Sequence, residues 1–186
     1  MKLKKANAVL GLLTILLMLM HIGYTVFAYI TMYYNPLLKN VLAWPFVVML
    51  CLHAVCGMLA VFLHSDGMRS LHYPGKNRRT IIQRVSAALF FPLLILHINT
   101  FSLMKGCASR GQKGFIYLLI LGEILFFAVV ITHVASSLTN AFITLGWLSS
   151  RETQKKLDKV IYVIGAIVFI VAVIAVVRGQ AIMFLS

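Results

Sequence analysis

Acidic side chains are the scarcest chemical group in this sequence. Only four of its 186 residues are acidic, and charged residues of both signs make up 11% of the chain. An ordinary soluble domain carries about a quarter charged residues. Hydrophobic residues account for 61% of the chain, which excludes a disordered protein, because disorder requires low hydrophobicity. The composition therefore predicts a membrane protein.

Signals of a second, soluble unit are also missing from the sequence. It contains no nucleotide-binding glycine motif, and none of its polar links is long enough for another domain. Cys51, Cys56 and Cys107 form no metal-like pair and are expected to be small packing residues. We therefore expect one domain, residues 1–186, without a flavin or dicarboxylate site of its own.

The sequence contains several long apolar stretches. A membrane-spanning helix needs about 20 mostly apolar residues. The first stretch follows three lysines, but it is too long for a signal-peptide core and no small-residue cleavage site follows it. The sequence thus predicts an all-α membrane protein with five transmembrane helices, at about residues 7–32, 43–64, 82–104, 115–144 and 160–183.

Basic residues are unevenly distributed between these stretches. With five spans, twelve of the seventeen Lys and Arg residues fall on the side of the N-terminus and five on the other side. Because cytoplasmic loops are enriched in Lys and Arg, we expect a multi-pass protein of the cytoplasmic membrane with its N-terminus inside and its C-terminus outside. The basic loops suit contact with lipid headgroups, and they could also dock an acidic partner.

Histidine occurs once in each of the first four predicted helices, as His21, His53, His97 and His133. Ionisable side chains are costly in a bilayer and normally face the interior of a helix bundle, where they find a partner. One such residue could be a hydrogen-bonded packing residue. One in each of four consecutive helices indicates a shared function, so the first four helices are predicted to form the functional bundle.

Depth sorts these four residues into two pairs. At 1.5 Å per residue, His21 and His97 lie roughly 21 Å above the cytoplasmic edge, and His53 lies roughly 16 Å above it. His133 shares the depth of His53 if its helix leaves the bilayer near residues 141–144. Each level then holds one histidine from each of two helices.

Paired imidazoles at one depth suit the two axial positions of a haem iron, an arrangement that favours electron transfer over oxygen binding. A zinc or copper site would need three or four ligands together, which two levels of two do not offer. Small residues near the histidines could make room for a flat macrocycle or could serve helix packing alone. These residues are Gly11, Gly23, Gly57 and Gly122.

Several stretches resemble the cytochrome b membrane anchor of succinate dehydrogenase and fumarate reductase, in its single-subunit, five-helix, two-haem form. The first two are Leu52-His53-Ala54-Val55-Cys56-Gly57 and Gln83-Arg84-Val85-Ser86, and Leu96-His97 follows at the right spacing. The longest runs from Thr132-His133 through Ser136, Asn140, Thr144, Gly146 and Ser150 to Gln154. The resemblance covers most of the chain and is weakest in the first helix.

This resemblance implies two haem b groups, an outer one held by His21 and His97 and an inner one held by His53 and His133. It also implies a flavoprotein subunit and an iron–sulfur subunit on the cytoplasmic side, and a quinone, commonly menaquinone, in the membrane. The chain would then supply only the quinone half of an oxidoreductase reaction. Family members often have another histidine just before the first helix, where this sequence has Lys4-Lys5-Ala6-Asn7.

Glu123 is the only acid inside a predicted span, and it lies toward the outer side of the fourth helix, near the outer haem. It is a candidate for the quinone site or for proton transfer, since quinone chemistry moves protons with electrons. It could equally bond a neighbouring hydroxyl or end near the headgroups.

Other polar residues are expected near the cytoplasmic side. His64 and Asn140 are further quinone-site candidates, although His64 could also contact a haem propionate or simply lie at the interface. Arg84 and Ser137 are candidate propionate partners, because a guanidinium pairs well with a carboxylate. Arg84 could instead be a cytoplasmic anchor, and the stripe of Ser137, Asn140 and Thr144 could serve helix–helix hydrogen bonds.

Three other classes of protein remain at this stage. One is a quinol-linked dihaem cytochrome b subunit of a different membrane oxidoreductase. Another is a transporter that uses the histidines for ions, which the shortage of membrane acids disfavours. A purely structural membrane scaffold is the least consistent with four costly buried histidines.

Overall fold

The structure is a computed structural model that describes residues 2–64 and 74–185, without the side chains of residues 64 and 74–77. The described residues form five helices, each long and apolar enough to cross a membrane. This confirms the prediction of an all-α, multi-pass membrane protein. The helices are α1 (Lys2–Thr31), α2 (Pro36–His64), α3 (Pro74–Ser109), α4 (Lys113–Leu145) and α5 (Arg151–Phe184).

Several helices extend beyond the apolar stretches. The α2 helix begins at Pro36 instead of near residue 43, because proline fits the first turn and the side chain of Asn35 accepts a hydrogen bond from the Leu38 N–H at 3.1 Å. The α5 helix begins at Arg151 instead of near residue 160. Hydropathy marks the part of a helix that lies in lipid, whereas the polar ends of these helices continue past it.

Two glycines mark the ends of α3 and α4. Gly111, in the turn after α3, has φ +66°, and Gly146, which follows α4, has φ +81°. Residues with a side chain rarely adopt this left-handed backbone conformation, whereas glycine adopts it readily. At Gly146 it lets the N–H groups of Gly146 and Trp147 bond to the carbonyls of Ile143 and Phe142, so the end of α4 is capped.

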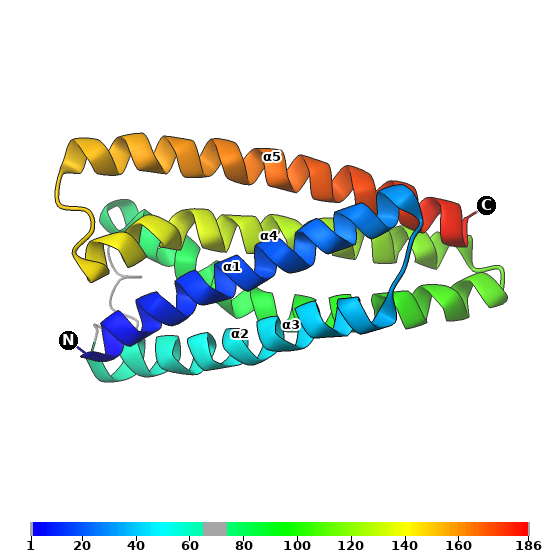
Figure 1. The fold of residues 1–186 in the computed structure, drawn as a ribbon, viewed down its shortest axis with the longest axis horizontal. Coiled ribbons are helices and arrows are strands. Elements are labelled where there is room, and N and C mark those ends of the chain that lie inside the picture. Colours follow the sequence, from blue (N-terminus) through cyan, green and yellow to red (C-terminus); the bar gives the residue numbers. More distant parts are fainter. Residues whose placement is uncertain (1, 65–73, 186) are drawn as a thin grey trace.

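The helices run alternately up and down along one long axis (Figure 1). The N-terminus and the α4–α5 link lie at one end, and the α1–α2 link, the α3–α4 link and the C-terminus lie at the other. The closest pairs are α1 with α2 and α3 with α4, while α5 packs against α1 and α4. Within the described residues, α2 comes into close backbone contact with α1 alone.

Apolar side chains from all of the first four helices meet at the centre of the bundle. They form a buried cluster of Met18, Phe46, Leu50, Phe90, Leu94, Phe126 and Val130. Because α2 does not approach the backbones of α3 and α4, these side chains fill the layer between the α1–α2 pair and the α3–α4 pair.

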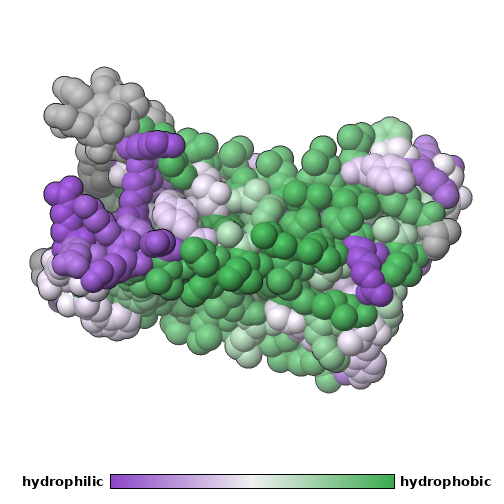
Figure 2. Space-filling view, turned by 90° about the horizontal axis from the view of Figure 1, so that it is seen from above, coloured by the Kyte–Doolittle hydropathy of each residue, from purple (hydrophilic) through white to green (hydrophobic). Residues whose placement is uncertain are grey.

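On the face seen in Figure 2, a broad hydrophobic belt lies between two hydrophilic ends. Large apolar side chains such as Leu121, Ile95 and Ile164 are more than half exposed. An exposed apolar surface of this extent is typical of contact with lipid. The belt therefore places the described helices in a bilayer environment.

A polar cluster joins three helices at the end of the bundle that carries the N-terminus. The Arg79 guanidinium on α3 donates to both carboxylate oxygens of Asp158 on α5, at 2.9 and 3.0 Å, and its Nε donates to the Ser136 carbonyl on α4 at 2.8 Å. The fully buried hydroxyl of Thr139 donates to Asp158 at 2.5 Å. Asp158 therefore ties α5 to both α3 and α4.

We expect Asp158→Ala to destabilise the protein by about 1–3 kcal/mol, since it leaves the buried Thr139 hydroxyl without its partner and removes a bidentate charged pair. Thermal unfolding in detergent measures the loss. Glu152→Ala is the matched control on the same helix, because Glu152 pairs with Lys156 where both side chains are 76% exposed. An exposed pair contributes about 0.3–0.5 kcal/mol, so equal losses in the two variants would contradict the role given to Asp158.

Candidate functional site

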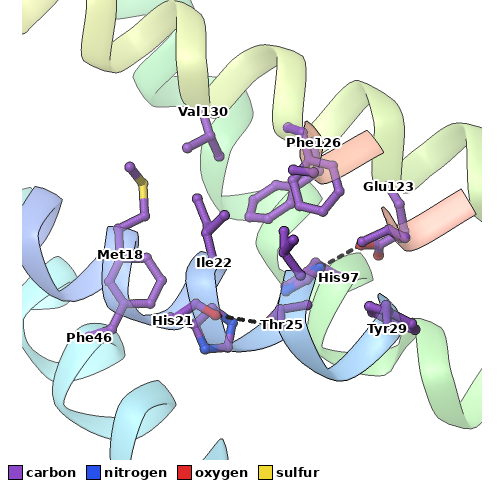
Figure 3. A pocket seen from close by; sticks show the side chains of 14 residues that line it. Met18, His21, Ile22, Thr25, Tyr29, Phe46, His97, Glu123, Phe126 and Val130 are labelled. Carbon is purple, nitrogen blue, oxygen red and sulfur yellow. Dashed lines mark hydrogen bonds and ion pairs between the residues drawn. The ribbon is translucent and has the colours of Figure 1, made fainter. Parts of the chain in front are cut away.

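His21 on α1 and His97 on α3 line one cavity within the bundle (Figure 3). The cavity wall is mostly apolar, and α5 also contributes to it. Besides the two histidines, the wall is formed by Met18, Ile22, Thr25, Val26, Tyr29, Phe46, Glu123, Phe126, Phe127, Val130, Ala172 and Val176.

The imidazole of His97 is fixed on two sides. Its Nδ1 atom lies 2.7 Å from Oε2 of Glu123, which is only 3% exposed. The ring of Phe126 stacks on it, with ring centroids 4.6 Å apart and an angle of 22° between the planes. A carboxylate accepts hydrogen bonds, so this contact suits an imidazole whose Nδ1 atom donates.

His21 is held less completely. The ring of Phe46 stacks on it at a centroid distance of 5.9 Å, with 16° between the planes. Its Nδ1 atom is buried and has no hydrogen-bond partner within the described residues. A buried polar atom in this state costs about 1–3 kcal/mol, so the imidazole lacks a partner that a bound group could supply.

His53 lies on α2 and is held by the first turns of α1. Its Nδ1 atom is 3.2 Å from the carbonyl oxygen of Asn7, and because a carbonyl only accepts, Nδ1 must donate. The ring lies close to Gly11, where an added methyl group would come within 3.0 Å of Cε1 of His53. A side chain at position 11 would require this imidazole to shift by a few tenths of an ångström.

His133 on α4 is held in the same way from α3. Its Nδ1 atom is 3.1 Å from the carbonyl oxygen of Gln83 and 3.2 Å from the hydroxyl oxygen of Ser86. The structure thus places His21 and His97 at one cavity, while His53 on α2 is held by α1 and His133 on α4 is held by α3.

The remaining candidates have different surroundings. The Asn140 side chain donates to Oε1 of Gln83 at 3.4 Å, while the Ser137 hydroxyl donates to the His133 carbonyl of its own helix at 2.7 Å. Arg84 is half-buried on α3. His64 is the last residue of α2, and its side chain lies outside the described part, so its role stays a prediction.

Of the other glycines near the histidines, only Gly122 is tightly packed against a neighbouring helix. A methyl group at Gly122 would come within 2.8 Å of the Leu96 side chain, so this glycine lets α3 and α4 approach each other. At Gly57 the nearest atom would be Oδ1 of Asn7, at an ordinary contact distance of 3.5 Å. A methyl group at Gly23 would meet nothing within 4 Å.

Within residues 2–64 and 74–185, no three His, Cys, Asp or Glu side chains gather into a site for a metal ion. No protein-family model, no curated protein and no solved structure matches this chain. Evidence on function accordingly comes from the four imidazoles and the groups that hold them.

Sequence reasoning missed the groups that orient the imidazoles. Two of these groups are backbone carbonyls, of Asn7 and Gln83, which no residue type marks. The contact between His97 and Glu123 did leave a signal, since the two residues lie at similar distances along the chain from the turn at Gly111. Residues placed in this way on two antiparallel helices share one depth.

Proposed function

We propose that this chain is a dihaem cytochrome b membrane anchor of a succinate:quinone oxidoreductase. In this role it connects an iron–sulfur subunit, itself bound to a flavoprotein subunit, with menaquinone or another quinone in the membrane. The observation that supports the proposal is that His21 and His97, from two different helices, line one mostly apolar cavity, while His53 and His133 are each held at Nδ1 by a neighbouring helix.

The residues present fit two haem b groups. In three of the four histidines the Nδ1 atom is in hydrogen-bond contact with an oxygen atom, which leaves Nε2 as the atom free to ligate iron. In the fourth, His21, the buried Nδ1 atom has no hydrogen-bond partner within the described residues. The apolar lining around the outer pair suits the faces of a macrocycle.

In this proposal His21 and His97 hold the outer haem, and His53 and His133 hold the inner one. A bound haem would supply one-electron transfer, and the two imidazoles of each pair would hold it. The chain's own residues orient the ligands and keep water out: Phe46 and Phe126 cover the outer imidazoles, and the α1 and α3 backbones anchor the inner ones.

Charge at one end of the bundle supports a partner there. The end that carries the N-terminus contains ten basic residues with described side chains, Lys2, Lys4, Lys5, Arg78, Arg79, Arg84, Arg151, Lys155, Lys156 and Lys159. The opposite end contains five: Lys39, Lys105, Arg110, Lys113 and Arg178. By the positive-inside rule the first end faces the cytoplasm, where the iron–sulfur and flavoprotein subunits would dock.

The test is a reduced-minus-oxidised spectrum of the purified full chain, with haem quantitation. We expect two low-spin haem b groups per chain and co-purification of a flavoprotein and an iron–sulfur subunit from the native membrane. A colourless protein would contradict the proposal. Two haems with a different set of partners would favour the quinol-linked subunit of another oxidoreductase.

A further inference from the structure

Glu123 is the most deeply buried charged residue among those described, at 3% exposure, and it contacts the imidazole of His97 directly. Oε2 takes this contact at 2.7 Å. Oε1 is buried and has no hydrogen-bond partner within the described residues. The hydrogen-bond contact of the Glu123 carboxylate within the described residues is therefore the one with His97.

This contact distinguishes His97 from the two inner histidines. His53 and His133 donate to backbone carbonyls, which are neutral acceptors. His97 alone meets a carboxylate in the described residues. Charge-assisted hydrogen bonds are roughly twice as strong as neutral ones, and a carboxylate partner raises the basicity of a metal-bound imidazole.

We infer that Glu123 is a positioning residue for the outer haem: it fixes the tautomer and orientation of the His97 imidazole and increases electron donation from that ligand to the iron. This inference rests on the proposed function. Stronger donation and a nearby negative charge in a low-dielectric interior both stabilise ferric over ferrous iron. Glu123 therefore holds the midpoint potential of the outer haem below the value that a neutral acceptor would give.

The test is Glu123→Gln in the full chain, followed by potentiometric titration of both haems. A glutamine oxygen can still accept from Nδ1 of His97, so the variant keeps the contact and removes the charge. We expect both haems to remain bound, the midpoint potential of the outer haem to rise, and that of the inner haem to stay unchanged. The outer haem is identified as the signal that His21→Ala loses and His53→Ala keeps.

Thr100→Val is the matched control. Thr100 is 2% exposed and lies one turn after His97, but its hydroxyl donates to the Leu96 carbonyl of its own helix at 2.9 Å. We expect this variant to leave both potentials unchanged. The low-spin electron paramagnetic resonance signal of the outer haem is a second readout, which should shift in Glu123→Gln and not in Thr100→Val.

Unchanged potentials and resonance signals in a Glu123→Gln variant that binds two haems would overturn the inference and leave the proposed function intact. If Glu123→Gln loses the outer haem, Glu123→Asp, which keeps the carboxylate, decides: recovery of that haem supports the inference, and equal loss overturns it. A wild-type protein without haem would overturn the proposed function itself.

Discussion

Replacement of His21 by alanine is expected to lower the haem content of the purified chain from two haems to one. The same loss is expected for His97→Ala, because these two histidines line one cavity and would ligate the same iron. His53→Ala and His133→Ala should each remove the other haem. Haem quantitation and the reduced-minus-oxidised spectrum measure both the amount and the identity of the haem lost.

Double variants distinguish two pairs of ligands from four ligands that act independently. A variant that lacks both His21 and His97 should still bind one haem, whereas one that lacks His21 and His53 should bind none. His72→Ala serves as the control, because His72 lies in a polar link of the sequence, outside the predicted spans. It also lies outside the residues that the structure describes. Equal haem content in every variant would contradict the ligand assignment.

Gly11→Leu is expected to remove the inner haem without altering any ligand. The nearest atoms to an added side chain at position 11 belong to the His53 imidazole, where even a methyl group would come within 3.0 Å of Cε1 and 3.3 Å of Nδ1. A leucine therefore pushes the ring away from the Asn7 carbonyl that orients it. We expect one haem per chain, with the spectrum of the outer haem retained.

Gly23→Leu is the matched control for this variant. Gly23 lies on the same helix and closer in sequence to His21, yet an added Cβ atom there would meet nothing within 4 Å. This variant should keep both haems. Retention of the inner haem in Gly11→Leu, with its normal resonance signal, would show that the close approach of Gly11 and His53 is not needed for binding.

Hydropathy and residue counting were sufficient to predict the helices and the candidate ligands. Five apolar stretches predicted five spanning helices, because burial in lipid depends on composition, which the sequence displays directly. The rise per residue put His21 and His97 at one depth, and the structure places both around one cavity. The depth of a residue along a regular helix can be calculated without knowing how the neighbouring helices are rotated.

Contacts that depend on helix rotation could not be predicted in this way. Asp158 lies just before the last predicted span, which begins near residue 160, and its pairing with Arg79 requires α5 to begin at Arg151 and to turn one particular face toward α3. The anchoring of His53 and His133 depends on backbone carbonyls of neighbouring helices, which every residue carries. Only the packed structure selects which carbonyl is used.

The cluster around Asp158 also fixes how far α5 can slide along its neighbours. Apolar helix surfaces in lipid offer little resistance to sliding, whereas the bidentate pair with Arg79 tolerates displacements of only a fraction of the 5.4 Å rise of one helical turn. Near the opposite end, the Tyr29 ring packs against Gly179, and Arg178 donates to the Ile30 carbonyl at 3.3 Å. Because α5 is held near both of its ends, it restricts how far α1 and α4 can be displaced along the bundle axis relative to each other. It therefore also restricts the relative positions of His21 and His133 along that axis.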